Sequence, residues 1–250
     1  MAGSQTGPVE TGTIEIRQLF QLSEFEEVLA MQKTIWGFED IELLPLRFLV
    51  VVSKVGGHVF GAYDGSRMVG FCFAIPGIKS DGRPYLHSHM LGVLPEYRNA
   101  AVGRRLKLRQ REDALARGIQ LIEWTFDPLE LKNAFLNIEK LGAIVRRYNP
   151  NQYGTTSSPL HGGLPTDRCI AEWWIASPRA AGQRAAHPET AERISYPADI
   201  ARIRAEEPAR AREIQQANAE KFLEAFARGL AVTGFARTET EGTYLLEPWQ

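Results

Sequence analysis

The chain has 250 residues, of which 44% are hydrophobic and 24% charged, with a formal net charge of −1 at pH 7. This length suffices for one large domain, or for one domain with a substantial extension, around a sizeable core. The lack of a basic excess argues against a nucleic-acid-binding protein. Cys72 and Cys169 lie in apolar strand-like runs, so we expect core thiols in a reducing compartment. With no signal-peptide pattern and no apolar window of about 18 residues, we expect no membrane partner and a cytoplasmic location.

The first half of the chain predicts an antiparallel meander. Residues 1–12 are rich in Gly, Thr and Ser, as in a loose tail. Helical spacing predicts one helix that ends at Trp36 and a second that begins near Pro45. Alternating apolar residues predict strands at 13–19, 58–63 and 67–76 and a further strand from Pro84.

From residue 101 the pattern changes to helix 101–117, strand 119–126, helix 130–140 and strand 143–148. Together with the preceding strand this order predicts parallel neighbours joined by right-handed crossovers. The expected fold class is therefore α/β, a mixed sheet with helices on its faces. The long loop 149–167 is typical of a functional or disordered segment, and a strand at 168–176 closes the core.

The C-terminal part has a different composition. Residues 177–198, rich in Ala, Arg, Pro and Glu, predict a linker or a surface crossing. A helix at 206–228 and a hairpin with strands 230–236 and 243–247 then form an extension, 199–250. It would pack on the main domain, 13–176, or on the partner in a homodimer.

The stretch from Tyr85 to Gly103 reads YLHSHMLGVLPEYRNAAVG. It predicts a strand, a Pro-centred turn and a small-residue loop that opens into a helix. The first turn of a helix offers unpaired N–H donors and the positive end of the dipole, which suits a phosphate group. Arg98, Arg104 and Arg105 could add charge-assisted bonds, although Arg104 and Arg105 could also belong to an ordinary solvated helix face.

With this order of elements, the segment 93–103 resembles the coenzyme A signature of the GNAT superfamily of N-acyltransferases. In that family the pyrophosphate of acyl-CoA is wrapped by a loop with a fixed pattern: Arg or Gln, any two residues, Gly, any one residue, then Gly or Ala. Arg98 and Gly103 match, whereas Ala101 replaces the first Gly, a mild departure if only one methyl group is added near the main-chain donors. The resemblance covers residues 13–176 in element order, with specific motifs only between 85 and 143.

The resemblance implies a GNAT-like fold, acetyl-CoA or another acyl-CoA as co-substrate, and no metal. Asn133 matches the family's contact to the pantetheine arm, and splayed strands would leave backbone groups near Leu91 and Val93 for the pantetheine amides. The implied cofactor-binding residues are Leu91, Val93, Arg98, Asn99, Ala100, Ala101, Val102, Gly103, Arg104 and Asn133.

N-acyl transfer requires a neutral amine, and histidine is a base with a suitable pKa near 7. His87 and His89, at i and i+2 of the opening strand, are predicted to point to one face. This placement resembles the arylalkylamine N-acetyltransferase branch, whose two strand histidines relay the amine proton through water. A pair of core histidines is the alternative, as is a metal pair, although no third ligand is placed beside them.

Members of the family often use a tyrosine in the segment that matches 137–141 to return a proton to the thiolate. In this sequence Ile138 stands near that position. Tyr148 and Tyr153 follow shortly downstream, and each is a candidate general acid or a packing tyrosine.

The predicted substrate-binding residues are Glu123, Asn151 and Arg168. Arg168 is the candidate clamp for a carboxylate, with an ion pair to a nearby Asp or Glu as the alternative.

The segments HSHM, WTFDPL and TDR together are similar to a GNAT branch that includes amino-acid N-acyltransferases, some of which use succinyl-CoA. The sequence therefore predicts transfer of an acetyl or succinyl group from acyl-CoA to the primary amine of a small molecule, an amino acid, directly in a ternary complex. The competing hypothesis is a catalytically silent acyl-CoA sensor or binding module, favoured by Ala101 and the missing tyrosine. A metal hydrolase using the His-x-His pair is a third.

Overall fold

The computed structural model describes residues 13–154, 162–183 and 190–249. The predicted tail 1–12 lies outside the described residues, as do parts of the loop 149–167 and of the segment 177–198. The chain divides into two compact units, residues 1–117 and 118–250, here called the first and the second unit.

The first unit is built on the predicted antiparallel meander. Its strands are β1 (Glu15–Gln18), β2 (His58–Asp64), β3 (Arg67–Ile78) and β4 (Pro84–Val93), paired in this order. Gly65 has φ 58° in the turn between β2 and β3, a conformation that glycine adopts without strain.

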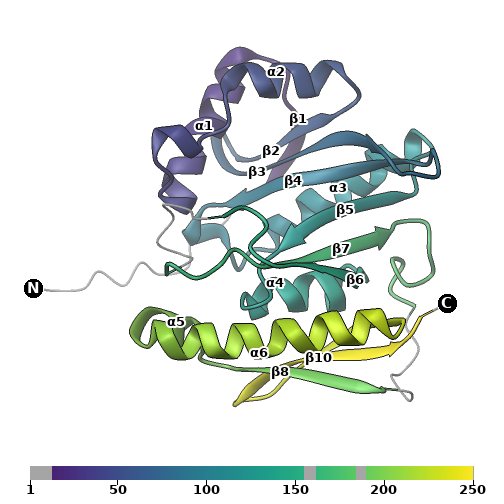
Figure 1. The fold of residues 1–250 in the computed structure, drawn as a ribbon. Helices are drawn as coiled ribbons and strands as arrows, with labels where there is room; N and C mark the ends of the chain where they lie inside the picture. Colours follow the sequence, from purple (N-terminus) through teal and green to yellow (C-terminus); the bar gives the residue numbers. More distant parts are fainter. Residues whose placement is uncertain (1–12, 155–161, 184–189, 250) are drawn as a thin grey trace, which may run out of the picture. The chain divides into compact units, whose positions relative to one another are not determined.

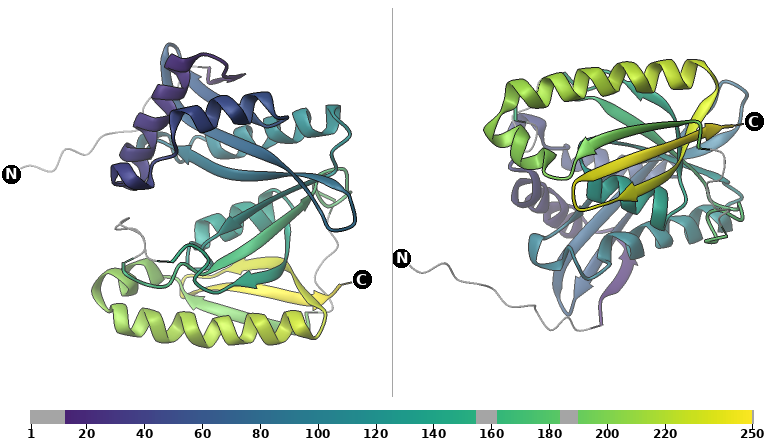
Figure 2. Two further views of the ribbon diagram at one scale, coloured as in Figure 1. Left: turned by 45° about the horizontal axis from the view of Figure 1, so that its top comes forward. Right: turned by 90° about the horizontal axis from the view of Figure 1, so that it is seen from below.

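Helices cover both faces of this meander (Figures 1 and 2). The helices are α1 (Leu22–Trp36), α2 (Leu46–Lys54) and α3 (Val102–Ala116), with short 3₁₀ turns at Asp40–Glu42 and Pro95–Tyr97. Trp36 of α1 packs edge-on against Phe71, with ring centroids 5.9 Å apart, and Phe48 of α2 packs edge-on against Phe73. Cys72, which alternates with these two phenylalanines, points instead to α3, where its thiol lies 3.9 Å from the carbonyl oxygen of Leu106.

The sheet of the second unit differs from the expected order. Its strands are β5 (Leu121–Phe126), β6 (Ile144–Asn149), β7 (Arg168–Trp174), β8 (Glu192–Pro197), β9 (Leu230–Arg237) and β10 (Glu241–Pro248), in the order β5-β7-β6-β9-β10-β8. The prediction that 119–126 and 143–148 are parallel neighbours is wrong, because β7 lies between them and is antiparallel to both. The alternation of strands and helices along the chain predicts crossover connections. It cannot predict that a later strand inserts between the two strands that a crossover joins.

The C-terminal residues of the second unit also depart from expectation. Residues 192–197, predicted to be linker, form β8 beside β10. Only Ile194 and Tyr196 are fully buried in this strand, which is too short an apolar alternation to be recognised in an Ala- and Arg-rich segment. The hairpin of β9 and β10 is confirmed.

The helices of the second unit are α4 (Leu131–Ala134), continued by a π-helical stretch (Phe135–Lys140), then α5 (Ile200–Glu206) and α6 (Pro208–Ala227). The helix predicted at 206–228 is α6, and the short helix α5 before it was not predicted. They are separated at Glu207, because the residue before a proline is disfavoured in the helical region. Phe222 of α6 contacts Tyr148 of β6 and Tyr244 of β10, and these rings form the centre of the core.

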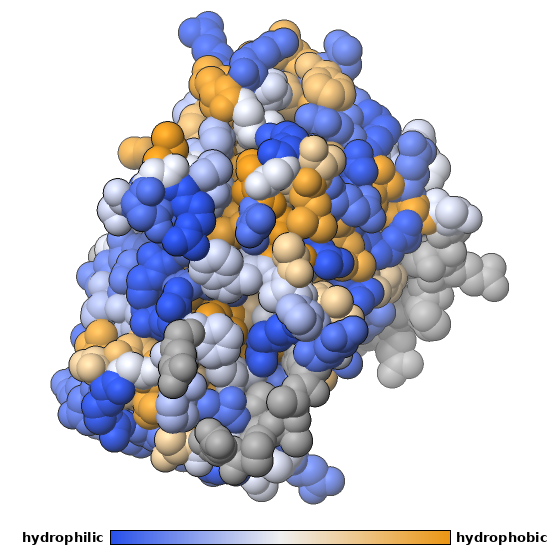
Figure 3. Space-filling model, turned by 90° about the vertical axis from the view of Figure 1, so that its right-hand side faces the viewer, coloured by the Kyte–Doolittle hydropathy of each residue, from blue (hydrophilic) through white to orange (hydrophobic). Residues whose placement is uncertain are grey.

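The surface carries no continuous apolar band on the face in Figure 3, where hydrophobic residues form separate groups among hydrophilic ones. Within the described ranges, no helix combines the length and the apolar character needed to cross a bilayer.

Candidate active site

Helix α3 begins at a loop whose backbone is shaped for an anion. Ala101, the N-cap residue, has φ 55° and ψ 14°, in the left-handed region that favours glycine. The first bond of the helix runs from the N–H of Arg105 to the carbonyl of Ala101, over 3.0 Å. The N–H groups of Val102, Gly103 and Arg104 precede it and have no helical acceptor. They lie at the positive end of the helix dipole, where a phosphate group can bind.

Replacement of glycine by Ala101 is a larger departure than the sequence suggested. A left-handed conformation costs a residue with a Cβ about 1–2 kcal/mol, whereas glycine adopts it freely. The strain comes from the backbone angle and not from crowding of the methyl group, because Ala101 is exposed.

Gly103 is not required by the packing of the protein. A Cβ at Gly103 would lie 3.4 Å from Cδ2 of Leu91 and 3.8 Å from Cγ2 of Val93, which are ordinary contacts, and its φ is not left-handed. A glycine that the fold does not need suits close approach of another molecule to the backbone. The loop from Ala101 to Gly103 therefore suits a phosphate group.

The arginines beside this loop are open to solvent. Arg98, Asn99 and Arg104 are exposed. Among the described residues, the guanidinium groups of Arg98 and Arg104 have no ion-pair partner within 4 Å. Arg105 instead donates to the carbonyl of Ile14 over 2.5 Å. Arg98 and Arg104 are thus placed for charge-assisted bonds with a phosphate.

His87 and His89 lie on β4 at a β-bulge. The register between β3 and β4 shifts between Phe73 and Ala74, which leaves His89 as the extra residue of β4. The ring centroids of the two histidines are 5.8 Å apart, so both side chains lie on one side of the strand, as their spacing predicts. Beyond the bulge the alternation changes phase, so the side chain of Leu91 lies on the α3 side.

Both imidazoles are weaker bases than a free imidazole, with His87 half-buried and His89 exposed on β4. Burial lowers the pKa of His87 to about 4, with smaller effects from the positive charges of His89, Lys107 and Lys79. Removal of water around the ring also lowers the pKa of His89. The expected pKa near 7 is therefore wrong for His87. Both groups are neutral at pH 7 and can accept a proton.

The two candidate tyrosines have different surroundings in the second unit. Tyr148 is buried, its hydroxyl donates to Oδ2 of Asp167 over 2.7 Å, and its ring stacks on Phe222. Burial raises the pKa of the Tyr148 hydroxyl far above 10, so this group holds its proton firmly. Tyr153 is 48% exposed, and its hydroxyl lies 2.9 Å from Oγ1 of Thr125 at the end of β5.

Arg168 and Asn151 lie beside Tyr153. The guanidinium of Arg168 lies over the Tyr153 ring, 5.3 Å from its centroid, and donates to the carbonyl of Asp167 over 2.9 Å. Asn151 has φ 43°, and its side-chain oxygen accepts from the N–H of Thr166 over 3.2 Å. Asn151 therefore joins the segment that carries Tyr153 to Thr166, two residues before Arg168 at the start of β7.

Glu123 belongs to a cluster of charges on the sheet of the second unit. Its buried carboxylate pairs with Arg147, and Glu172 of β7 lies opposite in register. Glu172 pairs in turn with Arg146 over 2.5 Å and with Arg147 over 3.4 Å. Charge compensation accounts for the burial of both carboxylates, and substrate binding by Glu123 stays a prediction. Asn133 is exposed on α4.

Sequence reasoning missed the polar groups beneath the histidines. Ser88 and Lys107 are 3% and 4% exposed, and the Lys107 ammonium donates to the Ser88 hydroxyl over 2.7 Å. A signal existed, because Lys107 lies three residues before Gln110 and one after Leu106 on the helix face that is buried. No group of three or more potential metal ligands from His, Cys, Asp and Glu occurs among the residues that the structure describes.

Comparisons with known proteins give the fold but not the activity. No family model matches the chain, and no curated protein matches it in sequence. Solved structures match in fold. NAA60 of Arabidopsis thaliana, in complex with acetyl-CoA, is 15% identical with a TM-score of 0.55, covering 66% of this chain and 100% of that one. A ribosomal-protein alanine N-acetyltransferase of Escherichia coli is 16% identical with a TM-score of 0.51, covering 70% and 98%.

A third structure is described as a putative acetyltransferase of the GNAT family from Desulfovibrio desulfuricans. It is 17% identical with a TM-score of 0.52, covering 66% of this chain and all of its own. The chain therefore has the fold of the GNAT acetyltransferases, as the coenzyme A signature predicted.

Proposed function

We propose that this protein is an acyl-CoA-dependent N-acyltransferase. The start of α3 supports this most directly: three backbone N–H groups without helical acceptors, a left-handed residue at the N-cap, and Gly103 where packing would allow a side chain. These features occur in a chain with the GNAT acetyltransferase fold, at the segment that resembles the family's pyrophosphate signature. The loop 98–104 binds the pyrophosphate, assisted by Arg98 and Arg104.

Chemistry requires removal of one proton from the attacking amine. His87 and His89 are neutral at pH 7 and accept it, directly or through a water molecule. A carbon–nitrogen bond forms as the carbon–sulfur bond of the thioester breaks, and the leaving thiolate regains a proton. We assign that donation to Tyr153, because its hydroxyl is accessible, whereas the Tyr148 hydroxyl is buried against Asp167.

We propose a small primary amine with a carboxylate, such as an amino acid, as the acceptor and Arg168 as its clamp. Arg168 is half-buried and oriented by the ring of Tyr153, which suits a fixed guanidinium for a carboxylate. Acetyl and succinyl groups are both candidate acyl groups. A protein amino group is the alternative acceptor, since one structural neighbour is a ribosomal-protein alanine N-acetyltransferase.

A thiol-release assay tests this proposal with acetyl-CoA and succinyl-CoA against amino acids, amino acid amides, arylalkylamines and short peptides. We expect release with amino acids, and we expect Arg168→Gln to raise KM for the amino acid but not for its amide. If Arg168→Gln raises KM equally for the amino acid and for its amide, Arg168 does not bind the carboxylate. Release with peptides alone would identify a protein-modifying enzyme.

A catalytically silent acyl-CoA sensor is the second candidate. The strained Ala101 and the low pKa of His87 favour it, because one weakens the match to the signature and the other weakens the base. Calorimetry with acetyl-CoA and succinyl-CoA, combined with the release assay, separates the two. Binding without thiol release in any mixture supports the sensor, and absence of binding refutes both.

A further inference from the structure

The residue between the two histidines is tied to α3 from the opposite side of the strand. Ser88 is 3% exposed, and its side chain points away from His87 and His89 because successive strand residues alternate. Its hydroxyl accepts from the Lys107 ammonium over 2.7 Å and donates to Oε1 of Gln110 over 2.9 Å. One serine thus joins β4 to two residues of the helix that begins at the Ala101 loop.

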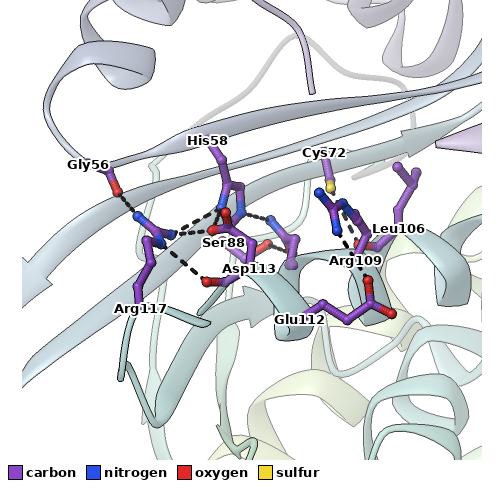
Figure 4. A network of polar contacts seen from close by, with 10 residues as sticks. Gly56, His58, Cys72, Ser88, Leu106, Arg109, Glu112, Asp113 and Arg117 are labelled. Carbon is purple, nitrogen blue, oxygen red and sulfur yellow. Dashed lines mark hydrogen bonds and ion pairs between the residues drawn. The ribbon is translucent and has the colours of Figure 1, made fainter. Parts of the chain in front are cut away.

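These bonds continue into a directed network, part of which Figure 4 shows. The amide nitrogen of Gln110 can only donate, so Nε2 of His58, 3.1 Å away, must accept. The proton of His58 then lies on Nδ1, which donates to Oδ2 of Asp113 over 2.8 Å. Arg117 closes the network with bonds to Asp113 over 2.5 Å and to the carbonyl of Gly56 over 2.6 Å.

The donor directions in this network are compatible with one exception: Nη2 of Arg117, which can only donate, lies 3.4 Å from Nδ1 of His58, which carries the proton in this tautomer. The protonated form of Lys107, present at pH values below its pKa of about 7, can only donate, so the Ser88 hydroxyl then sends its own proton to Gln110, and the direction of the Gln110–His58 bond follows. Burial lowers the pKa of His58, which keeps the ring in the neutral form that the network needs. The bonds from Lys107 through Ser88 and Gln110 to His58 join buried groups, and a satisfied buried network restricts its members to one arrangement.

We propose that Ser88, held by Lys107 and Gln110, is a positioning residue that fixes the β-bulge and thereby the orientation of His87 and His89. A bulge interrupts the ladder and leaves one residue unpaired, so its local geometry depends on other anchors. Ser88 is the residue next to the bulge with side-chain bonds to a different element. The role of the histidines rests on the proposed function, whereas the anchoring of the bulge does not.

Lys107 also connects to His87 through its charge. Buried with its ammonium at Ser88, Lys107 has its pKa lowered by burial to about 7 and itself helps to lower the pKa of His87. The charged groups that act on His87 are His89 of β4, Lys107 of α3 and Lys79 at the end of β3. Loss of Lys107 therefore raises the pKa of His87, a change that a purely structural residue would not produce.

The test compares Ser88→Ala, Ser88→Thr and the double variant Ser88→Ala/Lys107→Met. Ser88→Ala leaves a buried ammonium without its hydroxyl acceptor and can unfold, whereas the double variant removes that ammonium as well and leaves only the loss of the bond from Ser88 to Oε1 of Gln110. Ser195→Ala is the control, because Ser195 is also a strand serine with a side-chain bond, to Thr243 over 2.8 Å.

We expect the double variant to bind acetyl-CoA with unchanged affinity and to lose about tenfold in kcat, the scale of misplaced catalytic groups. Ser88→Thr, which keeps a hydroxyl, should retain most of the activity. In NMR titrations of the ligand-free protein, the ring signals of His87 and His89 should move in the double variant and the pKa of His87 should rise. Ser195→Ala should change neither.

The two readouts separate the two proposals. If wild type transfers no acyl group but the double variant moves the ring signal of His89, on whose pKa the Lys107 charge does not act, the proposed function fails and the positioning role stands. If wild type is active and the double variant keeps both its kcat and its histidine signals, the positioning role is wrong.

Discussion

The left-handed conformation of Ala101 gives a sharp prediction for Ala101→Gly. The substitution removes a strain of about 1–2 kcal/mol in the folded state. Glycine also gives the unfolded chain more freedom, which offsets about 0.4–1 kcal/mol of this. Because the Ala101 methyl is exposed, little packing is lost. We expect Ala101→Gly to stabilise the protein by about 1 kcal/mol, or about 2–4 °C in Tm.

Ala116→Gly is the matched control. Ala116 is the last residue of the same helix, is exposed and has no left-handed φ. There the substitution should destabilise by about 0.5–1 kcal/mol, since glycine gains nothing in the folded state. The two variants therefore make the same chemical change and should move stability in opposite directions.

Urea unfolding followed by circular dichroism measures both variants, and hydrogen exchange of the α3 amides tests whether the change is local. Calorimetry should show an acetyl-CoA affinity of Ala101→Gly that is equal to or tighter than that of wild type, because the loop is then free to adopt its conformation. If Ala101→Gly is destabilised as much as Ala116→Gly, the strain at Ala101 does not exist.

Four further predictions concern the loop, the base and two buried charges. Gly103→Ala should leave the unfolding free energy unchanged or higher, because a Cβ there meets only ordinary contacts, yet weaken acetyl-CoA binding by about tenfold in calorimetry. His87→Ala should lower kcat/KM about 100-fold. In wild type, kcat/KM corrected for the fraction of neutral amine should fall only as pH drops through about 4; a limb near 6.5 would contradict the role of the half-buried His87 as the base. Lys107 has a folded pKa of about 7 against its usual 10.5, so the folded state binds fewer protons between these values. The unfolding free energy of wild type relative to Lys107→Met should therefore rise with pH across that window, and a constant difference would show that the ammonium is not buried. Arg204 is 9% exposed and pairs with Asp127 over 3.1 Å, so Arg204→Met should destabilise by about 3–5 kcal/mol in urea unfolding. The double variant Arg204→Met/Asp127→Asn should recover part of the lost unfolding free energy. If it recovers none, the unpaired charge of Asp127 is not the cause of the destabilisation.

The sequence predicted most local structure because local structure follows from local patterns. Apolar alternation identified β2, β3 and β4, and helical spacing identified α3 and the helix that follows β5. The small-residue loop before α3 was also predicted, since a phosphate loop needs short side chains and a helix start that are adjacent in the chain. These features gave the fold class and the candidate cofactor loop.

Tertiary structure decided the features that depend on residues distant in the sequence. The insertion of β7 between β5 and β6 depends on strand pairing, and the bulge at His89 on the register between β3 and β4. Neither feature can be identified from the pattern of apolar residues in a single strand.

Burial decided the chemistry of the candidate base. Histidine at i and i+2 suggested a base with a pKa near 7, but loss of water around His87 lowers its pKa to about 4. In the sequence Lys107 is one of several charged residues in a helical run. Only the packing of the folded protein brings its ammonium to the Ser88 hydroxyl. The sequence by itself thus determined most of the elements, without β8 and α5, and where a phosphate could bind. Desolvation and long-range pairing, which exist only in the folded protein, decided how the histidines are held and how strongly they bind a proton.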